Sequence, residues 1–217
     1  MGQRVTAKYR ISRFHDEKGN FVDGAGLLNA VPAFATAAAK RLFNYRPPVP
    51  MISYRGRRVI EGLLTPESRM VEFGSGNSTL WFAARAGSVL SIEDDDHWYR
   101  HVQKQCADRG ISNVRHELRT AETYADMSDV ADASLDFALV DGTDRAGCIH
   151  SVVNKLKPGG WLYLDNSDKD MTLPDGDVRR AEQALLDAVQ QRQGQLRYFS
   201  DFSPTNFFVE QGLLARL

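Results

Sequence analysis

Short apolar segments alternate with amphipathic ones from Arg69 to the end of the chain. Glycines close three of the amphipathic segments, as is typical of helix ends. Strands that alternate with helices predict βαβ units and a parallel sheet. Strands are expected at residues 69–73, 88–93, 113–118, 134–141, 161–166, 196–202 and 206–211, and helices at 78–87, 95–110, 145–157 and 177–194.

The last two predicted strands have no helix between them. They are joined by the short segment "SPT" (Ser203 to Thr205), so they require antiparallel, hairpin-like pairing. The run "FALV" within 134–141 is apolar throughout, as in a strand that is buried on both faces. The pattern therefore predicts five or six parallel strands, with one antiparallel strand at or near the edge.

The segment before residue 51 follows a different pattern. Residues 1–22 are polar and poorly periodic, which predicts a loose or accessory arm. Residues 24–43 have helical composition, in which Pro32 either breaks the helix or occupies the first turn of a later one. The proline-rich connector 44–51 predicts a boundary between an N-terminal arm and helical appendage (1–50) and a main domain (51–217). Ser53 is expected to cap a helix that ends near Leu64.

Composition narrows the functional class. The chain has 217 residues, is 42% hydrophobic and carries a net charge of −1, so it lacks the basic excess of a phosphate binder. It has two cysteines and no apolar run of membrane-spanning length. No secretory segment opens it. We expect a cytoplasmic protein without nucleic-acid or membrane partners, and a homodimer remains open.

Candidate chemistry begins at the end of the first strand, in "VEFGSGNST". Gly74 and Gly76 bracket a tight turn that permits close approach of a ligand to the backbone. Ser78 or Thr79 is expected to cap the next helix, whose free N–H groups favour a negative group. Glu93 ends the second strand nineteen residues after Gly74, a spacing at which an acid binds ribose hydroxyls. These features together predict a nucleoside-containing ligand.

Glu93 could instead cap the following helix, but Asp94, Asp95 and Asp96 are available for that role. A nicotinamide dinucleotide is the competing ligand, and its G-x-G-x-x-G motif requires a third glycine where Thr79 stands. Glu72, just before the loop, suits a ligand amino group and suits a pyrophosphate poorly.

The ordered set "VEFGSGNST", "SIEDD", "LDFALVDG" and "LKPGGWLYLDN" resembles the class I S-adenosylmethionine-dependent methyltransferases. The resemblance implies a doubly wound, mostly parallel seven-stranded α/β sheet with an antiparallel C-terminal strand and S-adenosylmethionine as cofactor. It assigns the methionine part to the glycine loop, the ribose to Glu93 and the adenine to the segment after the third strand. The implied cofactor-binding residues are Glu72, Gly74, Ser75, Gly76, Ser78, Glu93, Asp94, Trp98, Ala121, Glu122 and Asp141.

Strand-end acids suggest what is methylated. Asp141, Asp165 and Asn166 resemble the metal ligands of the catechol and caffeoyl-CoA O-methyltransferase group, which implies Mg²⁺ or another divalent cation and O-methylation of a small molecule or sugar. That group commonly places a lysine near the fourth strand's acid, whereas this chain has Thr143, Asp144 and Arg145.

Candidate catalytic residues are therefore Asp141, Asp144 and His150. Alternatively, Asp141 and Asp165 cap loops and order the cofactor pocket without a metal. An NAD-dependent oxidoreductase and a non-catalytic cofactor-binding scaffold are the competing functions.

Overall fold

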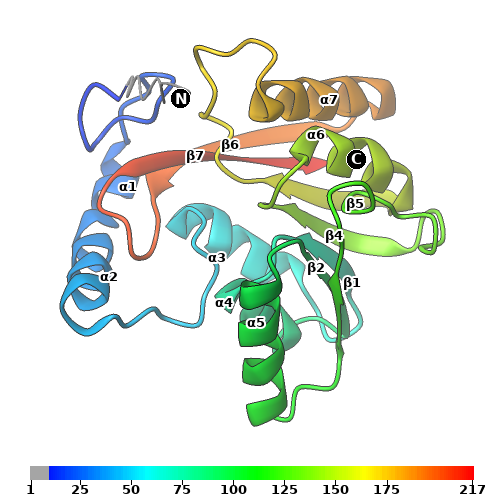
Figure 1. Cartoon of the computed structure of the whole chain (residues 1–217). Coiled ribbons are helices and arrows are strands. Elements are labelled where there is room, and N and C mark those ends of the chain that lie inside the picture. Colours follow the sequence, from blue (N-terminus) through cyan, green and yellow to red (C-terminus); the bar gives the residue numbers. More distant parts are fainter. Residues whose placement is uncertain (1–9) are drawn as a thin grey trace, which may run out of the picture.

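The computed structural model describes residues 10–217, which form one seven-stranded sheet flanked by helices (Figure 1). The strand order is β3-β2-β1-β4-β5-β7-β6. Neighbouring strands from β3 to β5 pair in parallel, and β7 is antiparallel to both β5 and β6. The strands are β1 (Arg69–Phe73), β2 (Ser88–Glu93), β3 (Val114–Leu118), β4 (Leu135–Val140), β5 (Leu156–Leu164), β6 (Gln195–Phe202) and β7 (Val209–Arg216).

Helices cover both faces of the sheet (Figure 1). The helices are α1 (Gly24–Leu27), α2 (Ala30–Phe43), α3 (Tyr54–Leu63), α4 (Asn77–Ala83), α5 (Asp96–Asp108), α6 (Arg145–Val152), η1 (Val153–Lys155) and α7 (Asp177–Arg192). One core joins α6 and α7 to one face, and a second core joins α3 and α4 to the other. No helix in the described part of the chain is long and apolar enough to cross a membrane.

Alternating residues of each strand supply the two cores, because successive side chains point to opposite faces of a sheet. Val71 and Val140 pack beneath α6 and α7, whereas Met70 and Leu139 pack on the α3 and α4 side. Both faces are therefore buried, which explains the continuous apolar composition of β4.

The predicted sheet is confirmed, including the antiparallel C-terminal strand, and several element boundaries differ. β5 begins at Leu156 because "KPGG" is part of the strand, with an irregular register opposite Leu135 and Phe137. β7 begins at Val209 and runs to Arg216, later than predicted. α6 ends at Val152 and continues as the 3-10 turn η1.

The N-terminal region lies outside the sheet, as expected for residues up to about 64, and residues 1–9 lie outside the described part. The helical segment is divided into α1 and α2, and Pro32 is the third residue of α2, which is the second of the two alternatives. Ser53 caps α3 by accepting a hydrogen bond from the backbone of Gly56.

The prediction of a loose arm is wrong for residues 10–22. Asp16 is fully buried and accepts hydrogen bonds from Ser200 on β6 and Gln211 on β7, at 2.6 and 3.1 Å. Lys18 pairs with Glu182 on α7. The polar side chains that indicated an arm instead form hydrogen bonds and an ion pair that hold this segment against the β6–β7 edge and α7.

Candidate active site

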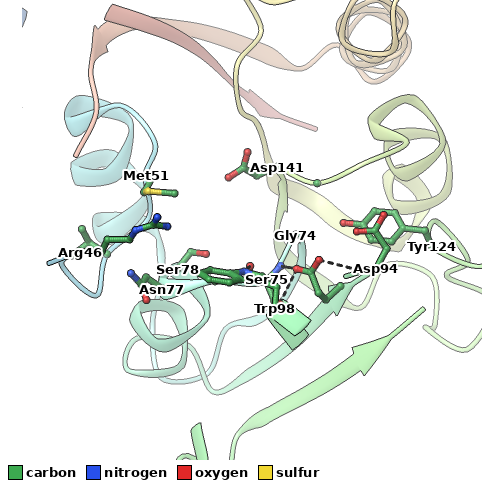
Figure 2. A pocket seen from close by; sticks show the side chains of 14 residues that line it. Arg46, Met51, Gly74, Ser75, Asn77, Ser78, Asp94, Trp98, Tyr124 and Asp141 are labelled. Atoms are coloured by element: carbon green, nitrogen blue, oxygen red, sulfur yellow. Dashed lines mark hydrogen bonds between the residues drawn. The ribbon is translucent and has the colours of Figure 1, made fainter. Parts of the chain in front are cut away.

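A cleft of about 260 Å³ lies beyond the carboxyl ends of β1, β2 and β4 (Figure 2). In open α/β sheets this edge is where ligands bind. Figure 2 shows Asp94 and Tyr124 at one end of the cleft and Arg46 and Met51 at the other. Its lining comprises Arg46, Val49, Met51, Gly74, Ser75, Gly76, Asn77, Ser78, Glu93, Asp94, Trp98, Tyr124, Asp141 and Gly142.

The two loop glycines are needed for different reasons. Gly74 has a φ of 97°, and a Cβ there would lie 3.0 Å from the backbone of Asp141 and Gly142. It therefore allows the loops after β1 and β4 to touch. Gly76 has extended backbone with a φ of 178°, and a Cβ there would lie no closer than 3.5 Å to its neighbours, on the side of Trp98. Of the two glycines, Gly74 is therefore needed for the fold, whereas the open space at Gly76 could be filled by a ligand.

The helix after the loop begins one residue earlier than predicted. Gly76 is the N-cap of α4, so Ser78 and Thr79 lie within its first turn. Thr79 accepts a hydrogen bond from the Gly76 N–H at 3.0 Å instead of capping the helix from outside. Ser78 remains in the cleft wall.

The Glu93 carboxylate organises the loop after β1. Its Oε2 accepts hydrogen bonds from the Ser75 N–H at 3.0 Å and the Ser75 hydroxyl at 2.9 Å. Its Oε1 accepts from the N–H groups of Asp94 and Asp95, each at 3.1 Å. A carboxylate offers about four acceptor positions, and these four donors occupy them. Three of the donors are backbone N–H groups, which are fixed, so the Ser75 hydroxyl is the donor that could turn away to admit a ligand hydroxyl.

Trp98 forms a wall between the loop and α5. Its indole N–H donates to the Ser75 carbonyl at 2.6 Å, and its ring stacks on His101 with centroids 5.0 Å apart. Because Asp95 caps α5 by accepting from the Trp98 N–H at 2.7 Å, the start of the helix fixes where the ring stands.

Tyr124 also lines the cleft, and the sequence interpretation missed it. It lies in the loop between β3 and β4, is fully buried, and packs against Phe73 with centroids 6.1 Å apart. Its hydroxyl has no hydrogen-bond partner among the described residues. A Cβ on Gly142 would lie 1.8 Å from that hydroxyl, so the glycine after Asp141 makes room for the tyrosine. In the sequence, the one signal for this role was that Tyr124 is the single tyrosine in an otherwise mostly polar segment between two predicted strands.

Ala121 and Glu122, the residues predicted beside adenine, lie in the same loop as Tyr124. Both are exposed, and neither is among the residues that line the cleft. The loop therefore reaches the cleft through its buried tyrosine.

Glu72 lies behind the cleft rather than in it. It is fully buried on the α4 side of β1 and accepts hydrogen bonds from Thr79 at 2.6 Å and Ser91 at 2.8 Å, while its Oε1 has no partner among the described residues. Burial raises the pKa of Glu72 to about 7. A ligand amino group has no direct access to this carboxylate in the described structure.

Asp141 stands at the cleft edge, at the end of β4. Burial raises the pKa of its carboxyl, and the Arg145 guanidinium, 3.3 Å from Oδ1, opposes the rise. Arg145 also donates to the carbonyls of Gly142 and Asp165, which ties the ends of β4 and β5 together. Burial, followed by the charges of Asp141 and Glu210, raises the pKa of Asp165 well above its usual range.

The other predicted catalytic and metal residues are placed differently. Asp165 and Asn166 do not line the cleft, and Asp165 is buried. Asp144 is exposed and caps α6 by accepting from the Gly147 N–H at 3.3 Å. His150 is exposed in the last turn of that helix, outside the cleft lining.

This donor set fits a divalent cation poorly. No group of three or more histidine, cysteine, aspartate or glutamate side chains among residues 10–217 could hold a metal ion. Arg145 already places a positive charge beside Asp141. Mg²⁺ requires oxygen ligands in near-octahedral geometry, whereas Asp141 is the one carboxylate of the predicted trio that reaches the cleft.

The connector between the appendage and the main domain contributes to the cleft. Arg46, Val49 and Met51 line it, and the side chain of Asn77 on α4 donates to the Pro47 carbonyl at 3.3 Å. In the sequence the prolines predicted only a boundary. Nothing in the sequence of residues 44–51 predicted that this connector would line the cleft beside the strand ends.

Comparisons with known proteins agree with this geometry. Residues 71–167 match a family model described as a methyltransferase domain. No curated protein matches the sequence significantly.

Three solved structures illustrate the shared fold. Cofactor-bound Rv0187 from MTB is 17% identical with a TM-score of 0.60, and the match covers 89% of this chain and 90% of that one. An rRNA methylase from Streptococcus thermophilus is 17% identical with a TM-score of 0.56, over 79% and 96% of the chains. A SAM-dependent O-methyltransferase from Thermotoga maritima is 15% identical with a TM-score of 0.52, over 83% and 70%.

Proposed function

We propose that this chain, whose residues 71–167 match a methyltransferase-domain family model, is a class I S-adenosylmethionine-dependent methyltransferase that transfers a methyl group to a hydroxyl oxygen of a small molecule or sugar. The observation that carries the proposal is the Asp141 carboxylate. It stands at the edge of the cleft beside the glycine loop, where a carboxylate can act as a general base, and burial raises the pKa of its carboxyl.

The cofactor would lie across the ends of β1 and β2. Gly76 leaves the backbone open to a ligand, Trp98 walls the loop, and Glu93 and Asp94 present carboxylates at the end of the cleft where the ribose belongs. Turning of the Ser75 hydroxyl away from Glu93 would free an acceptor position for a ribose hydroxyl. The unpaired hydroxyl of Tyr124 offers a further polar contact.

When bound, S-adenosylmethionine supplies an electrophilic methyl group on a sulfonium centre. Asp141 would orient the acceptor hydroxyl and take its proton on Oδ2, because Oδ1 is held by Arg145. The new O–C bond then forms as the C–S bond breaks, and the reaction depends chiefly on alignment of the three atoms. Burial, followed by the charges of Asp141 and Glu210, raises the pKa of Asp165, which favours its uncharged form beside Asp141.

The acceptor would enter from the side of the connector. Arg46, Val49 and Met51 form that part of the cleft wall and are close in sequence to the N-terminal appendage. One basic and two apolar side chains on this wall suit a small acceptor with both polar and apolar groups. The similar Thermotoga maritima protein is an O-methyltransferase, which is consistent with oxygen as the methylated atom, although the similarity concerns the fold.

Cofactor identity can be tested by thermal unfolding with S-adenosylhomocysteine and, separately, NAD. A ligand present at a hundred times its Kd adds about 2.7 kcal/mol of stability, which gives a clear rise in melting temperature. We expect that rise with S-adenosylhomocysteine alone. A rise in melting temperature with NAD alone would instead support the NAD-dependent oxidoreductase.

The reaction can be tested with isotopically labelled methyl donor and a panel of phenols, sugars and aliphatic alcohols, with matched amines as the second panel. Label on oxygen that is lost in Asp141→Asn supports the proposal. Label on nitrogen would keep the methyltransferase activity and reject O-methylation. Binding of S-adenosylhomocysteine without transfer to the acceptor panels would favour the non-catalytic scaffold.

A further inference from the structure

Helix α2 carries its apolar side chains outward. Ala33 is its one buried residue, although most of its fourteen residues are apolar. Leu28, just before it, is 77% exposed, and Val31 and Leu42 are 75% and 70% exposed. Phe34, Phe43 and Tyr45 each expose more than half of their surface as well. Large apolar surfaces of this kind mark interaction sites.

The outward positions follow a helix-pairing repeat. Val31, Ala35, Ala38 and Leu42 are spaced by four, three and four residues, which places them on one side of the helix. We call these four residues the α2 stripe. Leu28 precedes the helix, and Tyr45 follows its left-handed C-cap Asn44. Figure 1 shows α1 and α2 at the outer border of the molecule, beyond the β6–β7 edge of the sheet.

We propose that the α2 stripe binds the α2 stripe of a second copy of this chain, with the two helices antiparallel about a twofold axis. The axis would pass between Ala35 and Ala38. Each residue would then face a partner of matching character: Val31 faces the partner's Leu42, and Ala35 faces the partner's Ala38. A surface that complements itself in this way is what a twofold interface requires.

Size favours this occupant, and charge favours this direction. Stable interfaces bury about 800 Å² per partner, and the large apolar side chains at and beside the stripe each expose more than half of their surface: Leu28, Val31, Phe34, Leu42, Phe43 and Tyr45. Residues 24–60 include six basic and no acidic residues, and two of the basic residues, Lys40 and Arg41, stand near the C-terminal end of α2. Parallel helices would place these charges against their own copies, whereas antiparallel helices place them at opposite ends of the interface.

Small residues at the centre of the stripe favour a helix over a lipid surface. Ala35 and Ala38 allow two backbones to approach closely, whereas lipid insertion gains from larger side chains at that position. The connector that follows α2 enters the cleft through Arg46, Val49 and Met51. Pairing of α2 would therefore also hold in place the segment that leads into one wall of the candidate active site.

Sedimentation velocity from micromolar to near-millimolar concentration tests the interface. We expect the wild type to be a dimer that dissociates on dilution, and Leu42→Asp to be a monomer throughout. Leu173→Asp is the matched control, because Leu173 is 60% exposed in the loop before α7 and outside the α2 stripe. Circular dichroism and S-adenosylhomocysteine binding show that each variant is folded. A monomeric wild type, or a dimeric Leu42→Asp, overturns the proposal.

A charge exchange tests the antiparallel direction. Val31→Glu and Leu42→Lys should each abolish the dimer, and the double variant should restore it, because the introduced charges then face each other twice across the axis. In a parallel dimer each introduced charge would meet its own copy, so failure of the double variant to recover rejects the antiparallel arrangement.

A flotation assay with vesicles of equal parts phosphatidylcholine and phosphatidylserine provides the remaining discrimination. We expect that Leu42→Asp does not reduce the amount of protein that binds to the vesicles. Vesicle binding that is lost in Leu42→Asp, together with a monomeric wild type, would assign the stripe to a lipid surface instead.

Discussion

Glu93 and Ser75 are joined by two hydrogen bonds, from the Ser75 N–H at 3.0 Å and the Ser75 hydroxyl at 2.9 Å, both to Glu93 Oε2. The pair links the end of β2 to the glycine loop after β1. A residue proposed to bind ribose therefore also shapes the loop that surrounds the rest of the cofactor.

Glu93→Gln should weaken S-adenosylhomocysteine binding, measured by calorimetry. An amide retains the size of the side chain but loses charge-assisted hydrogen bonds, each worth about 1.5–3 kcal/mol, so the affinity should fall by roughly 10-fold to 100-fold. Asp96→Asn is the control, because Asp96 is exposed and pairs with Arg100 on the surface of α5. Equal affinity in Glu93→Gln and the wild type would reject the ribose assignment.

Substitutions at the two loop glycines should separate folding from binding. Gly74→Ala requires a strained positive φ and a contact at 3.0 Å with the β4 loop, so its melting temperature should fall, with a cost of about 1–3 kcal/mol. Gly76→Ala should fold normally because its backbone is extended and its surroundings are open, and it should bind S-adenosylhomocysteine more weakly. If Gly76→Ala binds like the wild type, the ligand does not approach the backbone there.

The strand ends were predictable because alternating apolar and amphipathic segments indicate a parallel sheet, and the carboxyl ends of parallel strands lie at one edge of it. Glu93, Gly74, Gly76, Trp98 and Asp141 accordingly line one cleft. Tyr124 was not predictable, because its position depends on how a loop without regular structure packs against Phe73. Glu72 and Asp165 were expected in the site but do not line the cleft, because a strand-end position does not say whether a side chain points into the cleft or behind it.

The contact between Gly142 and Tyr124 should be measurable as a coupling. Gly142→Ala places a methyl group against the Tyr124 hydroxyl and should destabilise the fold by about 1–3 kcal/mol in urea unfolding. Tyr124→Phe removes a buried hydroxyl that has no described partner, so alone it should have little effect on stability. The double variant should recover part of the loss. Strict additivity of the two effects would show that the two residues do not touch.

Glu72 should make stability depend on pH. Its folded pKa of about 7 lies above that of an unfolded glutamate, so the folded state binds the proton more tightly. Its contribution is complete below about pH 4.5, decreases as pH rises through 7, and then stays constant, with a total change on the order of 3 kcal/mol.

Urea unfolding of Glu72→Gln between about pH 5 and pH 8 tests this dependence. The variant should lose the Glu72 part of the pH dependence and should gain on the wild type at the upper end of the range. Other buried acids contribute equally to both proteins, so the difference between them isolates Glu72. Glu67→Gln, at an exposed acid, should follow the wild type. Parallel pH profiles of wild type and Glu72→Gln would mean that Glu72 ionises normally in the fold.

Asp141 should act as the general base, and the turnover rate should depend on it without any metal ion. Asp141→Asn retains the shape of the side chain but cannot accept the acceptor's proton, so the rate should fall by about 10²-fold to 10⁴-fold, with a small change in S-adenosylhomocysteine affinity. Asp144→Asn is the comparison, because an asparagine can still cap α6 by accepting from the Gly147 N–H, so both stability and the turnover rate should stay close to wild type.

The same assay in EDTA distinguishes the two mechanisms considered for the strand-end acids. Arg145 lies beside Asp141, and Asp165 and Asn166 do not line the cleft, so we expect full activity after EDTA treatment and no gain from added Mg²⁺ or Mn²⁺. Activity that disappears in EDTA and returns with Mg²⁺ would instead require Asp165 and Asn166 to move into the cleft and join Asp141 around an ion. A larger loss of turnover in Asp144→Asn than in Asp141→Asn would transfer the general-base role to Asp144.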